Sequence, residues 1–142
     1  MLKVVLDTSV FVSSLLSKNP YASPAQILKK WQEKHFTLIM SPQLLEELLE
    51  KLSEKQIDEN ILEQLVTAIT SLALHIEGAI TATYLDNIDP DDNIFLAAAY
   101  ESKADYLVSL DAKHLLPIKY YHGTQIVTPK IFLDLLDRKE II

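Results

Sequence analysis

Three acidic residues stand beside short apolar runs of the sequence. Asp7 directly follows one run, Asp92 precedes a second, and Asp111 lies just beyond a third. In an open parallel sheet, ligands bind outside the carboxyl ends of the strands, where residues from separate runs meet. Carboxylates that converge there repel one another unless a cation or a proton is present. Oxygen ligands of this kind favour a hard divalent cation, so the sequence predicts a site for Mg²⁺ or Mn²⁺.

Each of these acids also has a structural explanation. An aspartate after a buried strand is often a turn former or a helix cap. Asp91 or Asp92 can cap the helix that follows, and Asp111 can cap the turn after it. A leucine stripe in the segment 44–52 leaves Glu46 and Glu47 equally placed beside it, so periodicity does not choose between them. The metal-site prediction therefore rests on the joint placement of the acids.

Composition limits the class of protein. The chain has 142 residues, of which 49% are hydrophobic and 23% charged, and it contains no cysteine. These values favour one globular domain spanning residues 1–142, without a disulfide framework or a membrane span, and a cytoplasmic location. The net charge of −7 argues against broad nucleic-acid binding through basic side chains. That objection weakens if the acids hold divalent cations, which invert the local charge.

Short apolar runs alternate with helical patterns along the chain. We expect strands at 2–6, 37–40, 105–109 and 125–127, and a further short strand around 83–85. Serine–proline and threonine–proline pairs mark several helix starts between them. This alternation predicts an α/β fold: a mainly parallel central sheet of four to five short strands, covered by helices on both faces.

Three blocks of sequence, at 4–10, 41–48 and 89–111, occur together in an order that is typical of one family. On these blocks the chain resembles the PIN-domain nucleases over nearly its whole length, in particular the toxin components of bacterial or archaeal toxin–antitoxin pairs. The resemblance implies an endoribonuclease that hydrolyses phosphodiester bonds through an acidic Mg²⁺ or Mn²⁺ site. It also implies an RNA substrate, a cognate antitoxin protein and a homodimer.

The resemblance assigns roles to four acids, which would be both the metal ligands and the catalytic residues. Asp7 and Asp92 would be the main ligands, and Glu47 would be the acid supplied by a helix. Asp111 would be the fourth acid, acting through water. One departure lies beside it, because Leu110 stands where the family often has glycine. Supporting residues are expected at Ser9, Ser109, Asp89, Asp91 and Asn93.

Residues near the last acid are candidates for contact with nucleic acid. Lys113 and Lys119 could reach phosphate, and Tyr120 or its neighbour Tyr121 could stack on a splayed base. An ordinary surface loop is the simpler explanation for all of them. The four histidines show no ligand spacing, and only His114 lies near the acids in the sequence, so we expect no role for them.

Other functions fit parts of the same pattern. A phosphatase or phosphotransferase with Asp7 as nucleophile would place its carboxylate after a first strand, but that class typically has a second aspartate where this chain has Ser9. A receiver domain would need a lysine after a later strand, and that pattern is not clear. A third alternative is a protein that acts mainly by binding an antitoxin and has weak catalysis, with the Glu- and Gln-rich helices of 43–64 as its surface.

Overall fold

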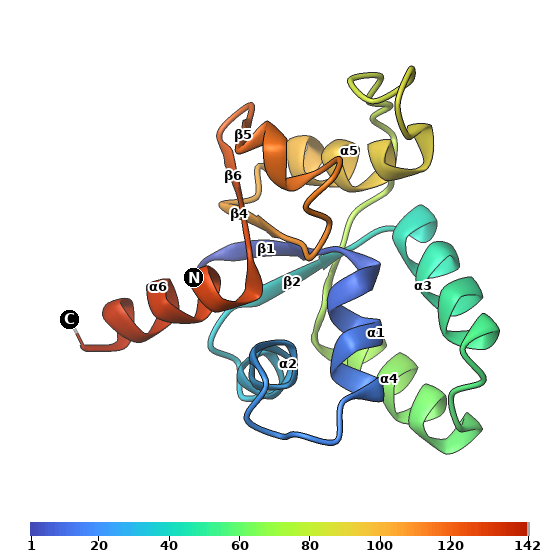
Figure 1. Cartoon of the computed structure of the whole chain (residues 1–142), viewed down its shortest axis with the longest axis vertical. Helices are drawn as coiled ribbons and strands as arrows, with labels where there is room; N and C mark the ends of the chain where they lie inside the picture. Colours follow the sequence, from blue (N-terminus) through green and yellow to red (C-terminus); the bar gives the residue numbers. More distant parts are fainter. Residues whose placement is uncertain (142) are drawn as a thin grey trace.

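The chain folds around a six-stranded sheet (Figure 1). The computed structural model describes the backbone of residues 1–141 and the side chains of residues 1–138. The strands lie in the order β3-β2-β1-β4-β6-β5, and every neighbouring pair is parallel except β5 and β6. Their bounds are β1 Lys3–Leu6, β2 Thr37–Met40, β3 Leu74–His75, β4 Tyr106–Val108, β5 Tyr120–Tyr121 and β6 Thr124–Val127.

Helices cover both faces of this sheet, as the alternating pattern predicts. Figure 1 shows α5 on one side of the sheet and α2 and α6 on the other. The helices are α1 Thr8–Leu16, α2 Ser23–Gln32, α3 Pro42–Glu54, α4 Glu59–Leu72, α5 Asn93–Ser102 and α6 Pro129–Ile141. Two 3₁₀ turns, η1 Pro90–Asp92 and η2 Leu116–Ile118, precede α5 and β5. Within residues 1–141, none of these helices has the length and apolar character that a membrane crossing requires.

The sheet has more strands than the four to five expected. The additional ones, β3 and β5, have two residues each, which is too short for an alternating pattern to show. The strand expected around 83–85 was wrong. That segment forms turns instead, because the Asp86 N–H donates to the Thr83 carbonyl and the Leu85 N–H donates to the Asn93 side chain. The strand that pairs with β2 at this edge of the sheet is β3, which precedes the segment 83–85 in the sequence.

Strand β1 lies at the centre of the parallel sheet, between β2 and β4. Val4 and Val5 are fully buried, as expected for a strand that is covered on both faces. Leu6 pairs with Val108 of β4, and the Asp7 N–H extends the ladder by donating to the Val108 carbonyl at 2.9 Å. Asp7 therefore leaves the sheet at the same edge at which β4 ends.

Helix α3 starts at a serine cap that fixes its orientation. The Ser41 Oγ accepts a hydrogen bond from the Leu44 N–H at 3.2 Å. Leu44, Leu48 and Leu52 then point into the core. Because residues three and four apart share a helix face, this stripe places Glu47 at the border between core and solvent.

The cap supports a prediction about stability. We expect Ser41→Ala to lower the free energy of unfolding by about 1 kcal/mol, because the Leu44 N–H loses its acceptor at a buried helix start. Urea unfolding followed by circular dichroism measures this difference. Ser53→Ala, at an exposed position near the end of the same helix, is the control and should change little. Equal effects of the two substitutions would contradict the capping role.

Candidate active site

Asp7 is the most buried acid of the site. It caps α1, and its Oδ1 accepts from the Ser9 N–H at 3.2 Å. Its Oδ2 accepts from the Ser9 Oγ at 3.0 Å and from the Ser109 Oγ at 2.5 Å. Burial raises the pKa of Asp7, the hydrogen bonds from Ser109 and Ser9 oppose that rise, and the charge of Asp111 adds to it. Asp7 is thus a carboxyl group at the carboxyl end of the central strand, and its burial disfavours the ionised form.

Ser109 links two of the predicted acids. It is fully buried just beyond β4, and its hydroxyl donates to Asp7 while accepting from the Asp111 N–H at 2.9 Å. Across the same junction, the Ser9 Oγ accepts from the Leu110 N–H at 3.3 Å. The two serines expected as supporting residues are therefore part of one hydrogen-bond network. Leu110, with 44% of its surface exposed, does not keep Asp111 out of this network.

Asp92 and Asp111 form a carboxyl pair. The two side chains are hydrogen-bonded to each other, which requires a proton between them. Burial, this hydrogen bond and the charges of Asp89, Asp7 and Asp111 raise the pKa of Asp92 to about 8. Burial would also raise the pKa of Asp111, but hydrogen bonds from the His114 N–H, from Asp92 and from the Lys113 N–H bring it below its usual range. At neutral pH the pair holds one proton, on Asp92.

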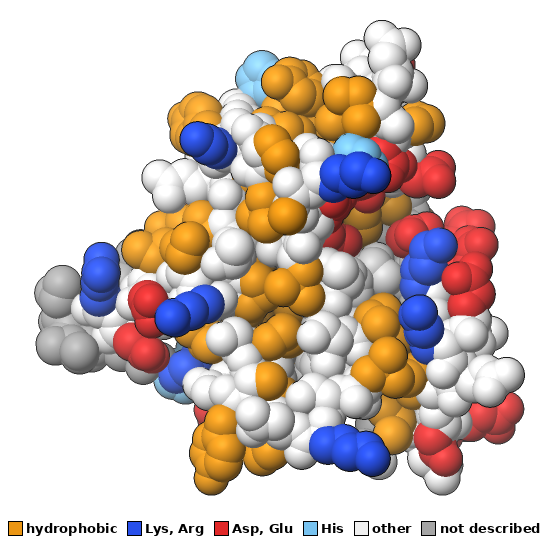
Figure 2. All heavy atoms as spheres, viewed as in Figure 1, with side chains coloured by type: hydrophobic (Ala, Val, Ile, Leu, Met, Phe, Trp, Pro, Cys, Tyr) orange, Lys and Arg blue, Asp and Glu red, His pale blue; other side chains and the backbone are white. Residues whose placement is uncertain are grey.

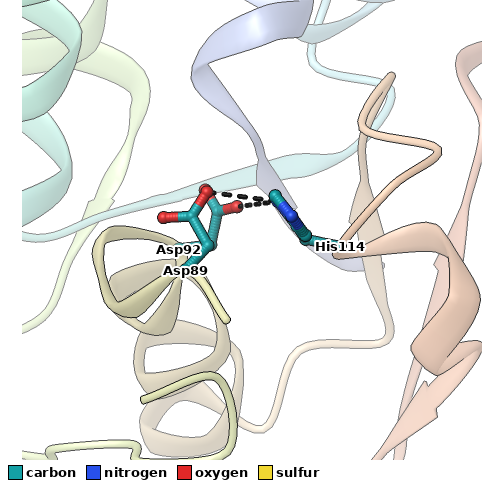
Figure 3. A group of neighbouring side chains, drawn as sticks. All are labelled: Asp89, Asp92 and His114. Atoms are coloured by element: carbon teal, nitrogen blue, oxygen red, sulfur yellow. Dashed lines mark ion pairs between the residues drawn. The ribbon is translucent and has the colours of Figure 1, made fainter. Parts of the chain in front are cut away.

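His114 lies among the acids, whereas from the sequence we expect no role for the histidines. Its Nδ1 lies 3.2 Å from the Asp89 Oδ2, 3.8 Å from the Asp92 Oδ2 and 3.7 Å from the Asp111 Oδ2. Figure 3 shows Asp89 and Asp92, at the start of α5, facing His114 across the site. His114 follows Asp111 by three residues, one turn of the chain, and this spacing was the signal available in the sequence.

Glu47 approaches the site from α3. The preceding residue, Glu46, is exposed, whereas Glu47 is half-buried. Burial raises the pKa of Glu47, and the charges of Glu50, Asp91 and Asp7 add to that rise while Lys51 opposes it. Glu47 and Asp91 line one surface pocket of about 220 Å³. Figure 2 shows acidic side chains gathered around a recess between the start of α5 and α3.

Other candidates lie outside this cluster. Asn93 is buried, and its side chain accepts from the Leu85 N–H at 2.9 Å and donates to Asp86 at 2.7 Å, so its contacts hold the preceding loop. Lys113, Lys119 and Tyr120 are exposed. The Lys113 backbone N–H donates to the Asp111 Oδ1 at 3.0 Å, but among residues 1–138 the side chains of these three residues form no hydrogen bond or ion pair with the acids.

The donor set fits a divalent cation. Among residues 1–138, no Lys or Arg side chain forms an ion pair with Asp7, Asp92 or Asp111. Their negative charge is offset by hydroxyl and amide donors, by His114 and by the proton on Asp92. A cation would take the place of that proton, with Asp7, Asp92, Asp111 and Glu47 as the oxygen ligands or the partners of bound water.

This proton gives a pH dependence whose sign follows from the raised pKa. The folded chain keeps the Asp92 proton up to about pH 8, whereas the unfolded chain releases it at the usual acidic value. The stability of the metal-free protein should therefore fall as the pH rises towards about 8, and affinity for a divalent ion should rise over the same window.

Thermal unfolding in EDTA at several pH values measures the first effect, and metal titration at the same pH values measures the second. Asp92→Asn is the control, because it cannot release this proton and should flatten both dependences. A metal-free Tm that rises with pH through neutrality in the unaltered protein but not in the variant would contradict the assignment.

Comparisons with known proteins show the family and the fold of this chain. Residues 3–113 match the family model described as the PIN domain. The uncharacterized protein MJ1680 of Methanocaldococcus jannaschii is 32% identical over 145 residues, which cover 94% of this chain and 90% of that protein. The crystal structure of VapBC2 from Rickettsia felis bound to a DNA fragment from their promoter matches with a TM-score of 0.63 and 19% identity. That match covers 89% of this chain and 98% of the other. The last likeness shows the fold, and the family match extends over most of the chain: the chain belongs to the PIN-domain family.

Proposed function

We propose that this protein is a metal-dependent endoribonuclease whose ion is Mg²⁺ or Mn²⁺. Members of the PIN-domain family are nucleases, and the family match supports hydrolysis of phosphodiester bonds. The observation that carries the proposal is the meeting of Asp7, Asp92 and Asp111 at one sheet edge, where burial and the neighbouring acids raise the pKa of Asp92. Glu47 approaches the same site from α3. We infer that these four acids are the catalytic residues.

The side chains of the site have separate roles in the proposed reaction. A divalent ion at this site would supply positive charge for the scissile phosphate and lower the pKa of water towards neutrality. Ser9 and Ser109 hold the Asp7 carboxylate in one orientation, so that its oxygens need not reorganise when the substrate arrives. The Asp111 backbone N–H is fixed by Ser109, which sets where its carboxylate points. Glu47 lies at the open side and can orient water.

Phosphotransfer through Asp7 is less well supported. Both Asp7 oxygens already accept hydrogen bonds, and only 6% of the residue is exposed, so in-line attack on a phosphoryl group is hindered. The position two residues on, where phosphatases of this kind place a second carboxylate, is occupied by Ser9, which is bonded to Asp7 itself.

We extend the proposal to a cytoplasmic toxin with a cognate antitoxin and to a homodimer. The fold shared with the VapBC2 structure and the sequence blocks described above support this extension. A small reading frame directly upstream, whose product co-purifies with the chain, is the expected finding for an antitoxin. A monomer by light scattering at micromolar concentration would contradict the homodimer.

Cleavage of a labelled single-stranded RNA by the purified protein tests the function. We expect cleavage with Mn²⁺ or Mg²⁺, its loss in EDTA and its return when the ion is added back in excess. A DNA strand of the same sequence, run in parallel, shows whether the 2′-hydroxyl is needed for recognition. RNA cleavage that continues unchanged in EDTA would contradict the proposal.

A further inference from the structure

We propose that His114 is itself an ion ligand, so that the site joins one imidazole nitrogen to the carboxylates of Asp89 and Asp92 and binds Mn²⁺ in preference to Mg²⁺. This inference rests on the proposed metal-dependent function but concerns a different property, the choice of ion. It adds a nitrogen to a site that the sequence presents as purely acidic.

The distances are those of ligands around a single ion. The His114 Nδ1 and one oxygen each of Asp89 and Asp92 all lie within 4.8 Å of one another. Individually, the nitrogen lies 3.2 Å from the Asp89 oxygen and 3.8 Å from the Asp92 oxygen. Ligand atoms around an octahedral ion of the size of Mg²⁺ or Mn²⁺ are about 3 Å apart when adjacent and about 4 Å apart when opposite. The three atoms therefore leave room for one ion between them (Figure 3).

The chain directs Nδ1 to this point. The Asp111 Oδ1 accepts from the His114 N–H and from the Lys113 N–H, each at 3.0 Å, which ties the start of the turn to the site. Leu115, the next residue, is fully buried and anchors the other end of the turn. Asp89 and Asp92 lie at the two ends of the η1 turn, which the Asp92 N–H closes by donating to the Asp89 carbonyl. Both halves of the cluster are thus held by backbone contacts.

The nitrogen has a chemical consequence. Mg²⁺ prefers oxygen ligands, whereas imidazole suits later first-row ions, and affinity for a site with a nitrogen ligand increases from Mn²⁺ onwards along that row. An imidazole in the first coordination shell therefore favours Mn²⁺ over Mg²⁺. The competing explanation is that His114 is only an imidazolium paired with the acids. In that case its Nδ1 carries a proton and an ion would displace the ring.

Pulsed electron paramagnetic resonance on Mn²⁺ bound to the untagged full-length protein distinguishes these explanations. We expect nitrogen modulation from a directly bound imidazole in the unaltered chain, lost in His114→Asn and kept in His122→Asn. His122 is an exposed histidine on the ring cluster with Tyr100 and Tyr121, and it serves as the matched control. The measurement on the unaltered chain does not depend on whether any variant folds.

Affinity gives the second readout. We expect His114→Asn to weaken Mn²⁺ binding about 10- to 100-fold and Mg²⁺ binding less than about 3-fold, because asparagine offers an oxygen in place of the nitrogen. Absence of nitrogen modulation in the unaltered chain, or equal losses for both ions, would overturn the inference. These measurements use the metal alone: nitrogen-bound Mn²⁺ without RNA cleavage would refute the nuclease and leave the ligand assignment intact.

Discussion

Asp92→Asn is expected to lower metal-dependent RNA cleavage by about 10³-fold, which corresponds to several kcal/mol of lost transition-state stabilisation. Asp92 stands at the centre of the cluster, hydrogen-bonded to Asp111, close to His114 and under the charge of Asp7. An amide removes the negative charge that holds the ion while keeping the shape of the side chain. Initial rates on a labelled RNA, with the ion at saturating concentration, measure the loss.

The same substitution should have an opposite effect on the metal-free fold. Because the Asp92 carboxyl is surrounded by other acids, an uncharged amide should leave the Tm in EDTA unchanged or raise it. The increase in Tm that Mn²⁺ gives to the unaltered protein should disappear. Asp58→Asn is the matched control, since Asp58 caps α4 and asparagine caps equally well. Similar activity losses in both variants would contradict a specific role for Asp92.

Ser109→Ala is expected to weaken divalent-ion binding about 10- to 100-fold, as is typical when a residue that orients a metal ligand is removed. The Ser109 hydroxyl is fully buried and contacts the Asp7 carboxylate and the Asp111 N–H. Without it, Asp7 loses a donor that holds its pKa down, and the Asp111 N–H is left without an acceptor. The free energy of unfolding should also fall by about 1–3 kcal/mol.

Ser102→Ala separates the two effects of that change. Ser102 is another buried serine, but its hydroxyl donates a hydrogen bond to the Ala98 carbonyl inside α5. It should lower stability slightly and leave metal affinity unchanged. Isothermal titration with Mn²⁺ on both variants makes the comparison. Affinity in Ser109→Ala equal to that in Ser102→Ala would show that the Ser109 hydroxyl has no part in positioning the acids.

The parts of the fold that the sequence predicts are those with strong local signals. The apolar β1 run, the serine–proline start of α3 and its leucine stripe are each determined within a few residues. The two-residue strands β3 and β5 have no such signal, because their pairing depends on neighbours far along the chain. The segment 83–85 has β-branched and aromatic residues typical of a strand. It forms turns instead, and the Asn93 side chain accepts a hydrogen bond from the Leu85 N–H there.

In the site, too, the residues that could be predicted are those with a local signal in the sequence. Asp7 and Asp92 stand at ends of apolar runs, so their approach to one sheet edge follows from parallel topology. Glu47 could not be separated from Glu46 by periodicity, and the burial of one rather than the other depends on how α3 packs. His114 was missed because its only local signal is the spacing of three residues from Asp111, whereas its contacts with Asp89 and Asp92 join residues more than twenty positions apart in the chain.

The chemistry of the cleaved ends tests the central claim most directly. The proposed site activates water, so the reaction in ¹⁸O-labelled water should give products with a 5′-phosphate that carries the label and a 3′-hydroxyl, in a reaction that requires Mn²⁺ or Mg²⁺. Mass spectrometry of a short RNA of known sequence reads both ends at once. Products ending in a 2′,3′-cyclic phosphate, together with unlabelled 5′-hydroxyl ends, would mean that the substrate's own 2′-hydroxyl is the nucleophile and would contradict this account.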